Sequence, residues 1–204
     1  IIHQAFYTKE NADKLKKSLY TETDAFYDQG MFVDGLSYIQ TDYLHSFEEG
    51  IQALCQCLCL EPGNPKYFER GLETSSALFK IIDFNKNGDR LFKSCYFSGT
   101  TIARDYPWHC THPMSYLVTG PATQIARYNG NPTLVKLFID LADTLLRHIV
   151  DGEKRFMINF DTGEATVAPN TTDCLWNVFA TANSFSVKKE YTDQYYFADK
   201  VMQD

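Results

Sequence analysis

Three short segments of the sequence combine ionisable and aromatic side chains in a way that could support proton transfer. The first is Thr41-Asp42-Tyr43-Leu44-His45, the second runs over residues 109–116, and the third over residues 170–177. Neutral histidine is a common general base and tyrosine a common general acid, whereas a pair of carboxylates can share these roles in hydrolysis. The candidate catalytic residues are therefore His45, His109, His112, Tyr116, Asp42 and Asp173.

Each of these candidates also has an explanation that involves no chemistry. An aspartate in the first turn of a helix stabilises the helix macrodipole, which applies to Asp42 and Asp173. His112 could bond to the backbone at a helix start, and Tyr116 could simply fill the core. The sequence leaves both interpretations open.

The spacing of apolar residues predicts that helices position all three segments. A first helix begins near Thr8. A second begins at Thr41, a suitable N-cap, and ends at Glu61-Pro62-Gly63-Asn64. A third begins at Pro65, since proline favours the first helical position, and its pattern is expected to bury Leu72 and Phe79.

The turn Gly63-Asn64-Pro65 recurs as Gly130-Asn131-Pro132, so the chain contains a repeat. A helix over 112–128, kinked at Gly120-Pro121, precedes the second copy, and Pro132 opens the next helix. A third pair, over 171–186 and 190–202, lacks this turn. We therefore expect an all-α fold in one domain, residues 1–204, with an N-terminal helix and lead-in over 1–40 and three antiparallel helix hairpins over 41–204. The long connections 83–109 and 151–169 are partly β-like, and 155–167 reads as a small β-hairpin.

Composition and charge exclude some classes of partner. The chain has 204 residues, 15% of them aromatic, and a formal net charge of -7, so it offers no basic stripe for nucleic acid. No apolar run approaches the length that spans a bilayer. We therefore expect neither a nucleic acid nor a membrane as partner.

Some of the cysteines could form a cross-link, and one polar turn could bind a metal ion. Cys95, Cys110 and Cys174 could form one disulfide, but the sequence does not select the pair. Asp83, Asn85 and Asn87 match the first half of a calcium-binding loop, yet Ser94 stands where the bidentate acid belongs. A polar turn is thus favoured over structural calcium, and we expect no cofactor and no metal site.

With its Gly-Asn-Pro turns at 63–65 and 130–132, each followed by an amphipathic helix, the chain resembles the (α/α) toroid carbohydrate-active enzymes. This superfamily comprises six-hairpin glycosidases and helical polysaccharide lyases, and the resemblance covers most of residues 41–204. It implies part of an (α/α) toroid, a chain that is a piece of a longer protein with the remainder as its partner, and an oligo- or polysaccharide substrate. Localisation stays undecided, although this function would favour the periplasm or the extracellular space.

The resemblance also implies roles for the three segments, because helix starts face the substrate funnel in such toroids. The leading hypothesis is a polysaccharide lyase that cleaves a uronate-containing glycan by β-elimination, with histidine as base and tyrosine as acid. The alternatives are a glycoside hydrolase that uses Asp42 and Asp173, and a noncatalytic helical-repeat binding scaffold. The candidate substrate-binding residues, for stacking on sugars or neutralising the carboxylate, are Trp108, Trp176, Tyr43, Asn170, Asn177 and Arg104.

Overall fold

The computed structural model describes residues 9–168 and 175–185, without the side chains of Lys9, Ala12, Glu49, Trp176, Asn177 and Asn183. Helices provide most of the described structure. They are α2 (Lys9–Asp28), α3 (Tyr43–Ser46), the π-helical η1 (Phe47–Ile51), α4 (Gln52–Leu60), α5 (Pro65–Ile81), the 3-10 helix η2 (Pro113–Thr119), α6 (Gly120–Asn129), α7 (Pro132–Arg147) and α8 (Trp176–Phe185).

Short antiparallel strands occupy the connections between the helices. Two-stranded sheets form from β1 (Phe32–Val33) with β2 (Leu36–Ser37), β3 (Thr41–Asp42) with β6 (Tyr96–Phe97), β4 (Ile82–Phe84) with β5 (Arg90–Phe92), and β8 (Ile149–Val150) with β9 (Glu153–Lys154). A three-stranded sheet has the order β11 (Ala165–Thr166), β10 (Met157–Asn159), β7 (Cys110–Thr111). The structure is 56% helical and 16% strand, so the all-α prediction is wrong, and the fold is mixed, with nothing that indicates a toroid.

The two Gly-Asn-Pro turns end and restart helices as the repeat predicted. In both copies the asparagine is the N-cap and the proline is the first residue of the new helix. The Asn64 side chain accepts a hydrogen bond from the Lys66 amide at 3.2 Å, and the Asn131 side chain accepts from the Thr133 and Leu134 amides at 3.0 and 3.2 Å. These bonds satisfy amides that the helix itself leaves unpaired.

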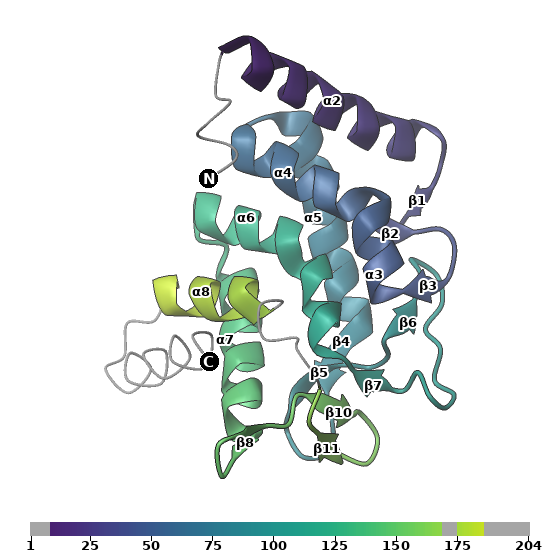
Figure 1. Cartoon of the computed structure of the whole chain (residues 1–204), viewed down its shortest axis with the longest axis vertical. Helices are drawn as coiled ribbons and strands as arrows, with labels where there is room; N and C mark the ends of the chain where they lie inside the picture. Colours follow the sequence, from purple (N-terminus) through teal and green to yellow (C-terminus); the bar gives the residue numbers. More distant parts are fainter. Residues whose placement is uncertain (1–8, 169–174, 186–204) are drawn as a thin grey trace.

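The helices preceding each turn stack on one another (Figure 1). Helix α6 packs between α4 and α8, while α5 contacts α4 and α6, and α7 contacts α6 and α8. Helix α2 lies across the top of this stack against α4. Strands β3, β6 and β7 lie beside the starts of α3 and η2, whereas β8 lies at the end of α7, and α8 also contacts η2. The start of η2 therefore lies next to the start of α3, on the side of the molecule that carries these strands.

The core lies between the stacked helices and continues under the strands. Its largest fully buried side chains include Phe92, Phe97, Tyr116 and Phe138. A smaller cluster of Leu54, Cys57, Leu58 and Tyr67 lies beneath α2. None of the helices in the described part of the chain is both long enough and apolar enough to cross a membrane.

Two of the expected helices differ in detail from their prediction. Residues 41–60 were expected to form one helix capped by Thr41, but Thr41 and Asp42 form strand β3, Asp42 is the cap, and η1 interrupts the helix. Residues 112–128 divide at Gly120 into η2 and α6. The exposure of Leu72 and Phe79, 37% each, is also higher than the apolar pattern predicted.

Candidate functional site

The pairing of β3 with β6 brings the start of α3 beside the segment that follows β5. In this sheet Thr41 lies opposite Phe97, and Asp42 lies opposite Tyr96. Asp42 then caps α3, accepting hydrogen bonds from the amides of Leu44 at 2.8 Å and His45 at 3.0 Å. The pairing therefore fixes where the Asp42 carboxylate can point.

The first turn of α3 and its N-cap residue present an Asp–His pair. The Nδ1 atom of His45 lies 2.8 Å from Oδ2 of Asp42, and the side chains are 58% and 31% exposed respectively. Partial burial acts to raise the pKa of Asp42, but hydrogen bonds from the amide and ring of His45 and from the Leu44 amide outweigh it and lower that pKa. An ionised Asp42 makes Nδ1 of His45 the protonated nitrogen, so Nε2 carries the lone pair of the neutral ring.

His112 lies across from this pair and has a different hydrogen-bonding role. Its ring stacks on Tyr43 with centroids 4.8 Å apart and an interplanar angle of 7°. Its Nδ1 accepts a hydrogen bond from the Met114 amide at 3.2 Å, which caps η2. Burial lowers the pKa of His112, so the ring is neutral near pH 7 and Nε2 is its donor.

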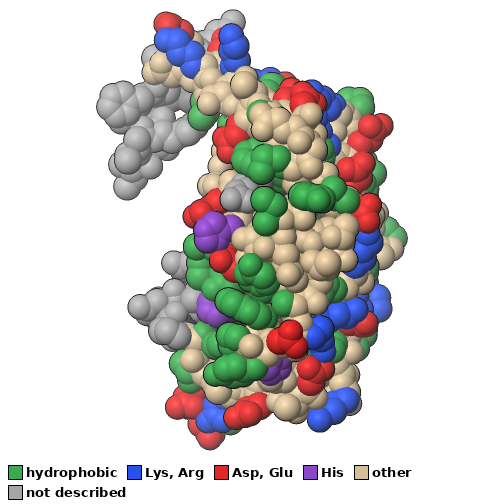
Figure 2. Space-filling model, turned by 90° about the vertical axis from the view of Figure 1, so that its right-hand side faces the viewer, with side chains coloured by type: hydrophobic (Ala, Val, Ile, Leu, Met, Phe, Trp, Pro, Cys, Tyr) green, Lys and Arg blue, Asp and Glu red, His purple; other side chains and the backbone are tan. Residues whose placement is uncertain are grey.

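An aromatic pair lies next to Asp42, because Tyr96 is the residue opposite Asp42 in the β3–β6 sheet. Trp108 is 38% exposed and stacks on Tyr96, with centroids 4.7 Å apart. Tyr106 is 86% exposed, and the centroid of its ring lies 6.0 Å from that of the His109 ring. The Nδ1 atom of His109 is buried without a partner among the described residues. Figure 2 faces this side of the molecule and shows histidines among hydrophobic and acidic side chains. We call Asp42, Tyr43, His45, Tyr96, Trp108 and His112 the aromatic–histidine surface.

Tyr116 does not belong to this surface, although the sequence made it a candidate acid. Its side chain is fully buried, its ring packs against Phe92 with centroids 5.2 Å apart, and its hydroxyl has no partner within the described residues. Burial also raises the pKa of Tyr116 far above its ordinary range. A glycan at the surface cannot reach this phenol, so Tyr116 is a core residue.

Arg104, the predicted carboxylate-binding cation, is already engaged. Its guanidinium pairs with Asp161, donates to the Lys93 carbonyl at 2.7 Å and lies 4.9 Å from the centre of the Phe160 ring. These contacts tie the loop before β7 to the β10–β11 hairpin. Arg104 could neutralise a ligand carboxylate only by exchanging Asp161 for it.

The third predicted segment is mostly outside the structural description. Asn170 and Asp173 lie outside the described residues, and for Trp176 and Asn177 only the backbone at the start of α8 is described. The structure thus brings together the first two predicted segments. It also adds Tyr96, which local sequence patterns could not identify because its pairing with Asp42 spans a long stretch of chain.

The turn considered for calcium forms its own internal hydrogen bonds. The side-chain oxygen of Asn85 accepts from the amides of Asn87 and Asp89, both at 2.9 Å, and Asp83 pairs with Lys93 at 3.1 Å. Across the described residues, no three His, Cys, Asp or Glu side chains are grouped as metal ligands.

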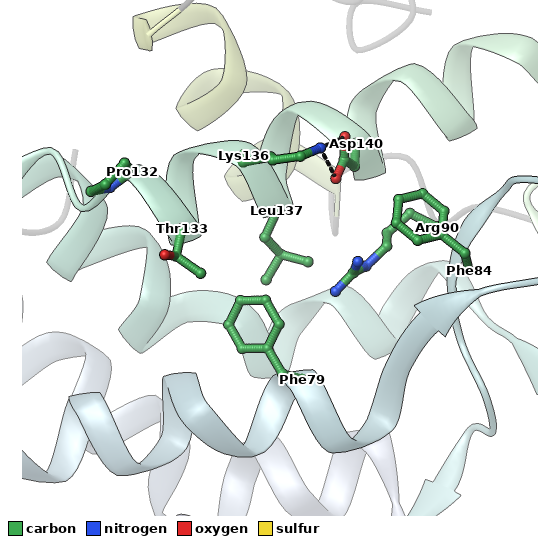
Figure 3. A pocket seen from close by; sticks show the side chains of 8 residues that line it. All are labelled: Phe79, Phe84, Arg90, Pro132, Thr133, Lys136, Leu137 and Asp140. Atoms are coloured by element: carbon green, nitrogen blue, oxygen red, sulfur yellow. Dashed lines mark hydrogen bonds and ion pairs between the residues drawn. The ribbon is translucent and has the colours of Figure 1, made fainter.

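A hollow with a volume of about 290 Å³ lies between α5, α7 and the β4–β5 hairpin (Figure 3). The guanidinium of Arg90 lies 4.7 Å from the Phe84 ring and 5.7 Å from the Phe79 ring, and Lys136 pairs with Asp140 at 2.8 Å. The partial exposure of Phe79 follows from its position in this lining. None of the site residues predicted from the sequence lies here, so the hollow is separate from the aromatic–histidine surface.

No protein-family model matches the sequence, and comparisons with curated proteins and with solved structures yield no match. The resemblance to carbohydrate-active enzymes therefore stays a prediction, and arguments about function rest on the residues themselves.

Proposed function

We propose that this chain belongs to an enzyme that cleaves a uronate-containing glycan by β-elimination at the aromatic–histidine surface. The observation that carries the proposal is the meeting of the Asp42–His45 pair with the stacked pair Tyr43–His112, which joins two segments far apart in the sequence. An oriented base beside a neutral donor and flat aromatic rings suits proton abstraction from a bound sugar.

His45 is the proposed base of this reaction. Its Nε2 would take the proton from the carbon next to the uronate carboxylate, while Asp42 holds Nδ1 and stabilises the imidazolium that forms. The electron pair of that C–H bond becomes the new C=C bond as the glycosidic C–O bond breaks. The leaving oxygen then receives a proton from an acid.

His112 and Tyr43 are proposed to assist His45 in this reaction. A neutral His112 can donate from Nε2 to the uronate carboxylate, which becomes more electron-rich as the proton is lost. Tyr43, stacked on His112, is the phenol that replaces the buried Tyr116 as candidate acid. Trp108 and Tyr96 offer an aromatic face on which a neighbouring sugar ring can pack.

The test is an assay of the protein against uronate-containing and neutral glycans, with two signals recorded together. We expect ultraviolet absorbance from an unsaturated uronate product to rise in step with the release of reducing ends. Reducing ends without the absorbance would establish hydrolysis and overturn the elimination. If neither signal appears and no glycan binds, the carbohydrate assignment itself is wrong.

A further inference from the structure

Two cysteine thiols lie against each other beneath the aromatic–histidine surface. The Sγ atoms of Cys95 and Cys110 are 3.7 Å apart, and the residues are only 6% and 8% exposed. The thiols of Cys55 and Cys57 instead contact Gln124 and Thr23. Of the three cysteines between which the sequence could not choose, Cys95 and Cys110 lie side by side, and Cys174 lies outside the described residues.

The backbone around this thiol pair is held by a shared acceptor. The amides of Cys95 and Cys110 both donate to the carbonyl of Trp108, at 2.9 and 2.8 Å. Closing the 3.7 Å sulfur separation to the bonded length of about 2.0 Å requires the two sulfur atoms to approach each other, while the shared acceptor holds the two backbone amides close together. The geometry is therefore prepared for a bond between the two sulfurs.

The two thiols also differ in acidity. A hydrogen bond between the two thiols lowers the pKa of Cys110, against the opposing effect of burial. The same hydrogen bond, followed by burial, raises the pKa of Cys95. Because the thiolate is the nucleophile in disulfide exchange, Cys110 is the sulfur that reacts first.

We propose that Cys95 and Cys110 form a reversible disulfide that closes the loop bearing Tyr96 and Trp108. The oxidant is a low-molecular-weight disulfide such as oxidised glutathione. The Cys110 thiolate attacks one of its sulfurs and expels a thiolate, and Cys95, losing its proton, then attacks Sγ of the mixed disulfide and expels the second thiolate. The two protein thiols lose two electrons and two protons in total, and the oxidant becomes two thiols.

The disulfide would restrain the loop that carries two residues of the aromatic–histidine surface. Tyr96 follows Cys95, and Trp108 lies two residues before Cys110, so the bond closes a loop whose ends carry the stacked aromatic pair. Bridging a loop of about fifteen residues is expected to raise Tm by roughly 5–10 °C. This inference does not depend on the reaction proposed above.

The experiment incubates the folded protein in glutathione buffers of graded redox potential, followed by alkylation of free thiols and peptide mass mapping. We expect a Cys95–Cys110 cross-linked peptide in oxidising buffer, its loss in reducing buffer, and a Tm that rises with cross-linking. Cys59→Ser is the matched control, because Cys59 is exposed and its removal should leave both results unchanged. In Cys95→Ser, Cys110 should accumulate the glutathione adduct and the Tm rise should vanish.

Alkylation of both thiols after full oxidation would overturn the proposal, as would a cross-link from either residue to another cysteine. A Cys110–glutathione adduct that persists in the wild-type protein would do the same. The mapping in the wild-type protein decides the matter even if a serine variant fails to fold, and no outcome of it depends on whether a glycan is cleaved.

Discussion

At the scale of single residues, two histidines on one surface have opposite hydrogen-bonding roles. His45 faces a carboxylate through Nδ1, which favours a protonated Nδ1 and leaves the basic lone pair on Nε2. His112 accepts an amide hydrogen at Nδ1, which requires that nitrogen to be unprotonated. The sequence identified both residues as candidates, but their roles follow from the partners that the fold supplies.

The half-buried, capping state of His112 predicts a specific pH dependence of stability. Because folding lowers its pKa below 6.5, the unfolded chain takes up the proton first as the pH falls. The free energy of unfolding should therefore decrease as the pH drops through and below 6.5. Urea unfolding at several pH values should show a shallower decrease in His112→Asn, since asparagine keeps an N-cap oxygen but does not titrate. Equal pH slopes in the two proteins would contradict this role.

At the scale of elements, a tight hairpin positions the loop that supports the site. Asp34 and Gly35 form the two-residue turn between β1 and β2, with φ values of 52° and 83°. The amide of Gly99 donates to the Ser37 carbonyl at 2.9 Å, which connects this hairpin to the loop after β6. The hairpin thereby holds β6 in place, and β6 in turn holds β3.

Gly35 should be the least replaceable part of this hairpin. An added Cβ would lie 2.3 Å from the backbone of Glu73 on α5, and the positive φ strains any other residue. Gly88 is a matched control, because its φ is +79° but nothing lies within 4 Å of the added atom. We expect Gly88→Ala to lower the free energy of unfolding by about 1 kcal/mol, and Gly35→Ala to lower it by at least about 2 kcal/mol more, as measured by urea unfolding. Similar losses in the two variants would show that α5 does not constrain the turn.

Elements with local signals could be predicted from the sequence, and those that depend on distant partners could not. The Gly-Asn-Pro turns act through their own asparagine and proline, so Pro65 and Pro132 gave the starts of α5 and α7 correctly. Thr41 and Asp42 instead pair with residues 96–97, a contact that no helical periodicity reveals. The sequence did indicate β structure in the connections 83–109 and 151–169, and β10 and β11 lie within the predicted hairpin over 155–167. Strands of two or three residues are nevertheless too short for an alternating pattern that would give their bounds.

At the scale of the whole molecule, α2 is attached to the rest of the protein through a separate small cluster. Its most extensive contacts are with α4 and η1, and much of its surface is exposed. Asp24 on α2 pairs with Arg70 of α5 at 2.7 Å, and this guanidinium also lies 4.1 Å from the Tyr27 ring. The large core continues from α5 to α8 without residues of α2.

This organisation predicts that α2 opens independently of the main helices. Asp24→Ala leaves the mostly buried Arg70 without its carboxylate and should cost about 1–3 kcal/mol of local stability. In hydrogen exchange, the α2 amides should lose protection in this variant while α7 amides keep theirs. Lys14 pairs with the exposed Glu10, so Lys14→Ala should leave the protection of both the α2 and the α7 amides unchanged. Equal loss of protection in α2 and α7 would mean that the molecule opens as one unit.

The role of His45 as the base in glycan cleavage can be tested by comparing His45→Gln with Tyr116→Phe. The measured quantity is kcat/KM from the absorbance of the unsaturated product, on the best uronate glycan of the panel. His45→Gln removes the base and should lower it by about 10²–10⁴-fold, whereas Tyr116→Phe changes only a buried hydroxyl and should stay within a few-fold of wild type. Full activity in His45→Gln, or a large loss in a folded Tyr116→Phe, would contradict the account.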